Sequence, residues 1–334
     1  MTLNLPDQLT LADLQNAAQR IRPYTVKTPC FSCELGATSL QLKFEFLQRA
    51  GSFKARGAMN NLLLLSESER RQGVTAVSAG NHAIATAYAA RELDTSAKVL
   101  MHRKANPFRI QRVHEFGGEV VLVDDIAVAF EEMRRISETE GRSIIHPFEG
   151  VRTMQGTGTL GLEIVEQLER FDLLLVAVGG GGLISGVGAA VKQLRPQVQI
   201  IGVEPEGAQG MTQSLAQGQP LEKVEVNTIA DSMGAPLHAP LSFSVCQQVI
   251  DQMVCVSDDA ICAAMAWAAD ELKLALEPAG CAVLAALMGP LEQECAGRSV
   301  AAILCGSNID TEGWAALVAR GRKSTNSTNP NPKN

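Results

Sequence analysis

Four consecutive glycines at residues 179–182 are the first feature of the sequence that indicates chemistry. They follow an apolar run at 173–178 and precede a helical pattern at 184–194. Glycines in such a turn let backbone N–H groups surround an anion, and the next helix N-terminus adds partial positive charge. A phosphate-bearing ligand is the expected occupant, and a tight packing turn is the alternative. The loop lacks the Lys and Ser or Thr of a P-loop, and Glu204 leaves a dinucleotide site as a minor alternative.

Lys54 is the second candidate, because it stands in the first turn of a predicted helix that begins after Gly51 and Ser52. A lysine at this end of a helix is unfavourably placed for the helix dipole. A functional lysine needs a lowered pKa, which burial or a neighbouring cation such as Lys43 or Arg56 could supply. The segment alone leaves a reactive lysine and an ordinary surface lysine equally open.

Two further predicted strand ends carry polar groups. Residues 78–82 read Ser-Ala-Gly-Asn-His between a strand and a helix, so hydroxyl, amide and backbone N–H groups could hold a carboxylate there. An ordinary helix cap with His82 at the surface is the alternative. Cys305 follows the apolar run 300–304 and is either a packing residue or a weak donor to a ligand. No neighbouring histidine supports a nucleophilic thiol.

Alternating strand and helix patterns place these candidates. The predicted helices are 8–22, 53–65, 82–92, 108–116, 128–138, 158–168, 184–194, 260–276 and 281–287, and the predicted strands are 40–48, 74–78, 98–102, 119–123, 143–145, 173–178, 199–203 and 300–304. Such alternation predicts an α/β protein with parallel strands and crossover helices. Residues 207–240 carry turn signals and are predicted to be mainly loop. The polar residues 321–334 are predicted to be disordered.

Composition restricts the class of protein. The 334 residues are 46% hydrophobic and 19% charged, as expected of a globular chain. The net charge of -7 disfavours binding to a nucleic-acid backbone. No secretory pattern and no membrane-spanning apolar run is present in the sequence, so a cytoplasmic location is expected. Eight scattered cysteines suggest reduced thiols, and the spacing of Cys30 and Cys33 lacks the second pair of a zinc site.

Taken in order, these segments resemble the fold-type II pyridoxal 5'-phosphate (PLP) enzymes, and within them the serine and threonine dehydratases and serine racemases. The resemblance spans about residues 8–320 and is carried by LKFEFLQRAGSFKARGA, SAGNHA, HPFEGVRTMQGTGT, VAVGGGGLISG, GVEPEGA, NTIADS, LEPAG and CGSNID. It implies a tryptophan synthase β-like fold of two open twisted α/β domains with the active site between them. Residues 1–48 and 148–320 would form the large PLP-binding domain, and residues 49–147 the small domain.

The resemblance also implies a role for each candidate. Lys54 would hold PLP as a Schiff base, Phe53 would pack beside the pyridine ring, and Cys305 would face the pyridine nitrogen. Asn81 would donate a hydrogen bond to the phenolic oxygen. The cofactor phosphate would lie against Gly179, Gly180, Gly181, Gly182 and Leu183. The substrate carboxylate would bind at Ser78, Ala79, Gly80, Asn81 and His82.

Cys305 and Ala79 favour elimination within this family. A thiol stabilises a pyridinium less than a carboxylate does, so the cofactor would be a weaker electron sink, which suits β-elimination. In the related racemases a serine at the position of Ala79 serves the second face of the substrate, and alanine has no transferable proton. The resemblance thus implies an ammonia-lyase that converts a β-hydroxy-α-amino acid, by preference L-threonine or L-serine, to a 2-oxo acid and ammonia. It also implies a homodimer or homotetramer.

Alternatives stay open. The substrate could be 3-hydroxyaspartate or phenylserine, or the enzyme could be a serine racemase with side elimination. A non-enzymatic module for a phosphorylated ligand is the alternative from another class. Glu204 and Ala208 match a cation site of the family, but Gly210 replaces its second acid, so a Mg²⁺ or K⁺ site stays open. Thr157 and Ser232 replace a usual Gln and Gly and can change the substrate pocket.

Overall fold

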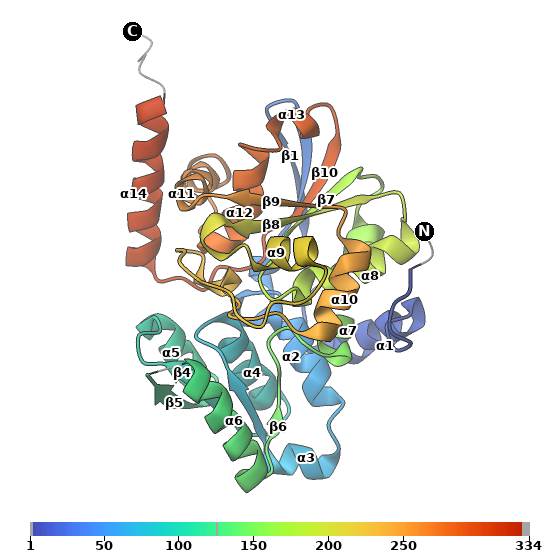
Figure 1. Ribbon diagram of the computed structural model, residues 1–334, viewed down its shortest axis with the longest axis vertical. Coiled ribbons are helices and arrows are strands. Elements are labelled where there is room, and N and C mark those ends of the chain that lie inside the picture. Colours follow the sequence, from blue (N-terminus) through green and yellow to red (C-terminus); the bar gives the residue numbers. More distant parts are fainter. Residues whose placement is uncertain (1–2, 125, 329–334) are drawn as a thin grey trace.

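Two β-sheets organise the molecule, and the computed structural model describes residues 3–124 and 126–328 (Figure 1). The larger, six-stranded sheet contains in spatial order β1 (Cys30–Leu35), β2 (Thr38–Lys43), β10 (Ser299–Ile303), β7 (Leu173–Ala177), β8 (Gln199–Pro205) and β9 (Gln252–Val256). The smaller, four-stranded sheet contains β5 (Glu119–Val123), β4 (Ala97–His102), β3 (Val74–Val77) and β6 (Ser143–Ile144). Described neighbours are parallel except for β1, which pairs antiparallel with β2. The predicted α/β class with parallel strands is confirmed.

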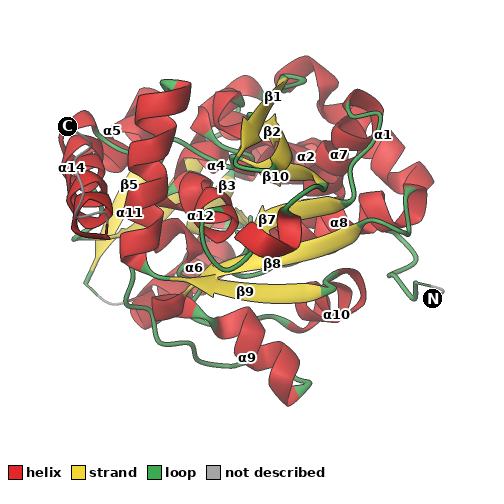
Figure 2. Cartoon of the chain, turned by 90° about the horizontal axis from the view of Figure 1, so that it is seen from above, coloured by secondary structure: helices red, strands yellow, loops and turns green. Residues whose placement is uncertain are grey.

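Helices link and cover these strands (Figure 2). The α-helices of the described residues are α1 (Leu11–Ile21), α2 (Lys54–Leu63), α3 (Glu67–Gln72), α4 (Asn81–Glu92), α5 (Pro107–Glu115), α6 (Ile126–Glu140), α7 (Val151–Gln167), α8 (Gly182–Leu194), α9 (Gly210–Gln217), α10 (Pro240–Val249), α11 (Asp258–Trp267), α12 (Pro278–Leu287), α13 (Glu292–Cys295) and α14 (Thr311–Thr328). Helices α4, α5 and α6 pack on the smaller sheet, whereas α12 packs on β7, β8, β9 and β10 of the larger one.

The central strand β7 shows how the sequence positions the site. Its residues Leu-Leu-Leu-Val-Ala are all buried, because β8 and β10 pair with its two edges and helices cover it. Such a continuous apolar run is typical of a parallel strand inside an α/β core. The glycine run begins two residues beyond the carboxyl end of β7. The buried strand therefore fixes the position of the loop.

Most of the predicted elements are present, with several corrections. Strands β1 and β9 and helices α3, α9, α10, α13 and α14 were not predicted. The predicted strand 40–48 already ends at Lys43, and the predicted helix 260–276 breaks after Trp267 into a π-helical turn. Helix α7 begins seven residues before the predicted 158–168. Its early glycines allow close helix packing, since a Cβ on Gly156 would lie 2.6 Å from the backbone oxygen of Arg56.

The prediction of a disordered tail at 321–334 is wrong for its first part, because α14 continues to Thr328. The helix packs along α11, and Gly321 permits this approach: a Cβ there would lie 2.0 Å from the carbonyl oxygen of Cys262. Arg320 also pairs with Asp259 at 2.8 Å. Tertiary contact therefore extends a helix that its own polar sequence does not indicate. Residues 329–334 lie outside the described residues.

The larger and the smaller sheet occupy the upper and lower halves of the view in Figure 1. Each has its own apolar core. The two halves are joined near the candidate site, where Ser52 forms a β-bridge with Gly306 just beyond β10. The domain boundaries at residues 49 and 147 stay a prediction. Within the described part of the chain, no helix has the length and apolarity to cross a bilayer.

Candidate active site

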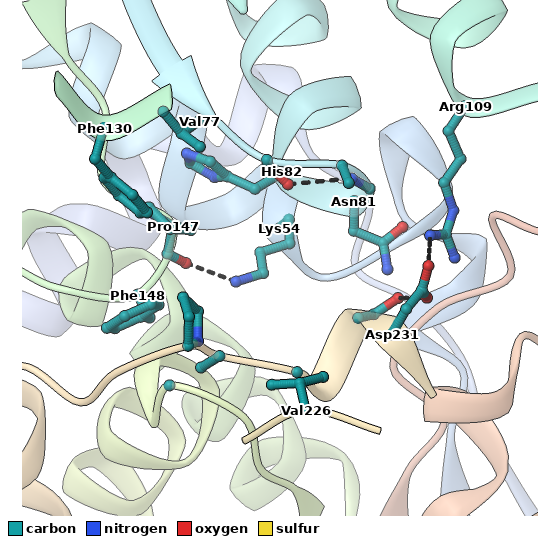
Figure 3. Close-up of a pocket in the computed structure, with 18 residues that line it drawn as sticks. Lys54, Val77, Asn81, His82, Arg109, Phe130, Pro147, Phe148, Val226 and Asp231 are labelled. Atoms are coloured by element: carbon teal, nitrogen blue, oxygen red, sulfur yellow. Dashed lines mark hydrogen bonds and ion pairs between the residues drawn. The ribbon is translucent and has the colours of Figure 1, made fainter. Parts of the chain in front are cut away.

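The strand ends bring the predicted residues into two adjoining cavities. The first is lined by Phe53, Lys54, Asn81, Ala177, Gly179, Gly180, Gly181, Gly182, Leu183, Ser232, Met233, Glu277, Ala279 and Cys305. The second encloses about 300 Å³ and is lined by Lys54, Val77, Ser78, Ala79, Gly80, Asn81, His82, Arg109, Phe130, Pro147, Phe148, Gly180, Val226, Asp231, Ser232, Gly234, Ala235 and Pro236 (Figure 3). Lys54, Asn81, Gly180 and Ser232 border both cavities.

Lys54 is partly buried rather than solvated at the surface. Its Nζ donates a hydrogen bond to the carbonyl oxygen of Pro147 at 2.6 Å and lies 5.1 Å from the centre of the Phe53 ring. Burial lowers the pKa of Lys54 to about 8, with a small opposing contribution from Cys305. A neutral amine, which can act as a base or a nucleophile, is therefore accessible near physiological pH.

Lys43 and Arg56 do not act as neighbouring cations of Lys54. Arg56 instead pairs with Glu45 at 2.8 Å and with Glu163 at 2.7 Å, and Lys43 pairs with the same Glu163 at 2.7 Å. Lys43, Glu45 and Arg56 are each 1% exposed or less. This buried network of ion pairs fixes α2 against α7 and β2, and so it positions the helix that begins at Lys54.

The glycine loop is shaped so closely by its surroundings that side chains do not fit. A Cβ on Gly180 would lie 2.4 Å from the ring of Phe148, and one on Gly182 would lie 2.6 Å from the Cα of Phe148. Gly181 has φ +87°, a left-handed conformation that favours glycine, and caps α8. Thr157 braces the loop from α7 by donating to the carbonyl oxygen of Gly182 at 2.7 Å. The backbone N–H groups of a glycine loop and of the helix N-terminus that follows it are suited to bind the phosphate of PLP.

A hydrogen-bond chain lies beside Lys54. Asn308 Nδ2 donates to Asn81 Oδ1 at 2.6 Å, and Asn81 Nδ2 donates to Glu277 Oε1 at 2.5 Å. Glu277 is fully buried, and burial raises its pKa against the opposing charge of Arg109. Its Oε2 has no hydrogen-bond partner among the described residues, but it forms an ion pair with Nη2 of Arg109 at 3.5 Å. The incomplete hydrogen bonding of this carboxylate beside the first cavity fits a site built for a polar ligand.

Glu277 was not predicted as a site residue, although its segment LEPAG contributes to the resemblance. The available signal was an acid directly before an apolar helix. Arg109 was also missed: its Nη1 pairs with Asp231 Oδ2 at 2.5 Å, and its Nε donates to the carbonyl oxygen of Asn308 at 2.9 Å. No motif marks Arg109, because its partners lie far away in the sequence. Cys305 lines the first cavity as expected, and burial raises the pKa of its thiol, which keeps it protonated.

The predicted carboxylate loop 78–82 lines the second cavity at the N-terminus of α4. Ser78 Oγ accepts a hydrogen bond from the backbone N–H of Gly80 at 3.2 Å. His82 is buried instead of lying at the surface, and its Nε2 donates to the carbonyl oxygen of Ile145 at 2.8 Å. Burial, assisted by the charge of Lys54, lowers the pKa of His82 to about 3, so the ring is neutral. Binding of a carboxylate here would use backbone N–H groups more than the imidazole.

Glu204 accepts hydrogen bonds at the start of a helix, and the cation site at Glu204 and Ala208 stays a prediction. Its carboxylate accepts hydrogen bonds from the backbone N–H of Met211 at 2.7 Å and from both N–H and hydroxyl of Thr212, at 2.9 and 2.7 Å. It thereby caps α9, and burial raises its pKa to about 7. Ala208 is buried, and Gly210 contributes no ligand side chain. Among residues 3–124 and 126–328, no group of three or more His, Cys, Asp or Glu side chains is placed to hold a metal ion.

The cysteines do not form a redox or zinc site. All eight, each of them within the described residues, are free. Cys30 and Cys33 lie on β1, where residues three apart point to opposite faces of the sheet. Their spacing is therefore a feature of a strand.

Comparison with known proteins adds an independent observation. Residues 21–306 match the family described as pyridoxal-phosphate dependent enzyme. A phenylserine dehydratase of Ralstonia pickettii is 44% identical over 96% of this chain and 98% of that protein. An L-threonine ammonia-lyase of Thermotoga maritima is 36% identical over 94% of this chain and 79% of that protein. The structure of maize serine racemase superposes with a TM-score of 0.86 at 33% identity, covering 94% of this chain and 98% of that one.

Proposed function

The chain belongs to the family of pyridoxal-phosphate dependent enzymes, and on that premise we propose that it catalyses β-elimination on a β-hydroxy-α-amino acid. The Cα–H and Cβ–O bonds break, and the amino group is finally released. Overall, R–CH(OH)–CH(NH₃⁺)–COO⁻ becomes R–CH₂–CO–COO⁻ and NH₄⁺, without an oxidant or reductant. The relatives named as dehydratases and ammonia-lyases support this reaction type.

The observation that carries the proposal is the position of the Lys54 amine, which is partly buried where the two cavities meet. PLP covalently held at Lys54 would withdraw electrons from the Cα of the substrate. The glycine loop would hold its phosphate, and Phe53, Asn81 and Cys305 would border its ring. Lys54, once released, would take the proton from Cα, since burial favours its neutral form.

The substrate would be oriented by the N-terminus of α4. Its first backbone N–H groups have no partner within the helix, so they can bind the α-carboxylate at the loop 78–82. Ala79 in that loop provides no proton. Lys54 would then be the acid-base group at Cα on one face only, which favours elimination over racemisation. Ala79→Ser tests this point, and chiral analysis of recovered serine should show more racemisation in this variant than in the wild type.

The names of the relatives include both threonine and phenylserine as substrates, so the substrate side chain is not settled by resemblance. A small amino acid as the binding partner fits the family. The homodimer or homotetramer and the cytoplasmic location stay predictions.

Two measurements test the proposal. Borohydride reduction of PLP-loaded protein, followed by peptide mass spectrometry, should find a stable adduct on Lys54. The same protein should release a 2-oxo acid and ammonium from a panel of β-hydroxy-α-amino acids, and Lys54→Ala should do neither. A Lys54→Ala variant with full turnover would contradict the assignment, and a protein that binds PLP but releases no 2-oxo acid would contradict the reaction.

A further inference from the structure

The second cavity has two chemically different ends. Asn81, Arg109 and Asp231 lie on one side of Lys54 in Figure 3, and Val77, Phe130 and Phe148 lie on the other, together with the neutral ring of His82. A substrate whose Cα lies beside the Lys54 amine and whose carboxylate lies at α4 therefore has a further, apolar compartment within reach. We name it the apolar end.

The apolar end is formed by two buried side chains, Val77 and Phe148, and one partly buried side chain, Phe130. Val77 terminates β3 and is 3% exposed, and Phe148 is 6% exposed. The ring of Phe148 packs edge-on against the ring of His146, with the two ring centres 4.6 Å apart, and it also packs against the glycine loop. Phe130 comes from α6 and packs on the small cluster that includes Val77. Packed side chains of this kind present a surface that is already formed before a ligand arrives.

A loop between α9 and α10 supplies the opposite wall. Val226, Ala235 and Pro236 line the cavity from this loop. Val226 is 43% exposed, so part of its side chain is in contact with water. An apolar substituent in the apolar end would cover it and remove that surface from water, which is favourable.

Charge in the cavity lies away from the apolar end. Among the described residues that line it, the charged side chains are Lys54, Arg109 and Asp231. Arg109 already pairs with Asp231 at 2.5 Å and lies 3.5 Å from the carboxylate of Glu277. The apolar end thus offers no cation to an acidic substrate side chain, which disfavours 3-hydroxyaspartate. A hydrogen or methyl group at Cβ would leave most of the apolar wall uncovered.

We propose that the substrate carries a bulky apolar group, in particular an aryl ring, at the hydroxylated Cβ. This inference rests on the proposed elimination and specifies the substrate class of the same site. Phenylserine is the simplest such compound, and its elimination would yield phenylpyruvate and ammonium. The ring would lie among Val77, Phe130, Phe148 and Val226.

The test compares substrates on the PLP-loaded enzyme. We expect kcat/KM for phenylserine to exceed that for threonine by about tenfold or more, since even one methylene in an apolar pocket is worth about tenfold. Phe130→Ala should lower the ratio of the two kcat/KM values by about tenfold. Phe31→Ala is the matched control: Phe31 is 45% exposed on β1, outside the cavity, and its removal should leave the ratio unchanged.

A binding measurement separates recognition from turnover. Phenylalanine and 2-aminobutyrate lack the β-hydroxyl and cannot eliminate water, and calorimetric titration should give phenylalanine the lower Kd by about tenfold. Preference for threonine, in turnover and in the matching Kd values, overturns the aryl assignment but leaves the elimination intact. A ratio that Phe130→Ala does not change refutes the position assigned to the ring. Release of no 2-oxo acid from either substrate refutes the proposed function itself.

Discussion

Removal of Arg56 should destabilise the protein strongly, although Arg56 does not line either of the two cavities of the site. Its guanidinium donates to Glu45 through Nε and Nη2, both at 2.8 Å, and to both oxygens of Glu163. Arg56→Met keeps much of the volume but leaves Glu45, which is 0% exposed, without its cation. Removing one partner of a buried ion pair costs about 3–5 kcal/mol, because the other charge stays buried. We expect a loss of this size in the free energy of unfolding at pH 7.

The pH dependence gives this prediction a second, signed test. Burial alone would raise the pKa of Glu45, but the charge and hydrogen bonds of Arg56 overcome it and lower that pKa. The wild type therefore gains stability from ionised Glu45 above the pKa of the unfolded chain, and loses it as the pH falls toward the lower folded pKa. Without Arg56 the pKa of Glu45 should be raised, so the variant should recover stability on acidification from pH 7, where the wild type does not.

Urea unfolding of the PLP-free protein, followed by circular dichroism at pH 7 and pH 5, measures both effects. Arg71→Ala is the matched control, since Arg71 pairs with Glu67 across one helical turn at the surface and such pairs contribute about 0–1 kcal/mol. An Arg56→Met variant within about 0.5 kcal/mol of the wild type would refute the reasoning, because that is the scale of ordinary surface substitutions. So would a difference between variant and wild type that grows on acidification.

Three further predictions concern the site. Gly180→Ala should weaken PLP binding by at least about tenfold, since its Cβ would lie 2.4 Å from the Phe148 ring. Absorbance titration with PLP measures this effect. Gly289→Ala is the control, because its Cβ would lie near only a backbone oxygen, at 3.2 Å. The rate of PLP attachment to the PLP-free protein should fall as the pH is lowered through about 8, because protonated Lys54 is no nucleophile, and a rate independent of pH between 7 and 9 would contradict the lowered pKa. Activity should not change on treatment with EDTA, because the Glu204 carboxylate already caps α9, and restoration of lost activity by Mg²⁺ would show otherwise.

Local sequence patterns were sufficient to predict those parts of the site that are formed by a single segment of the chain. The glycine run after β7, Lys54 at the start of α2 and the loop 78–82 before α4 were predicted from residue types and neighbouring periodicity. They could be predicted because a tight turn, a helix start and a buried strand each depend on residues within a few positions. The order of these segments then indicated the family and the fold.

Tertiary structure decided what depends on distant segments. How far Lys54 is removed from solvent is determined by Pro147 and the glycine loop, about a hundred residues further along the chain. The roles of Glu277 and Arg109, and the apolar end with Phe130 and Val226, arise from side chains that no motif connects. Burial, pKa and pocket polarity are sums over everything that surrounds a group in space. The sequence alone therefore indicated the kind of chemistry, whereas the fold decided the surroundings that lower the pKa of Lys54 and the shape and polarity of the cavity from which we propose the substrate side chain.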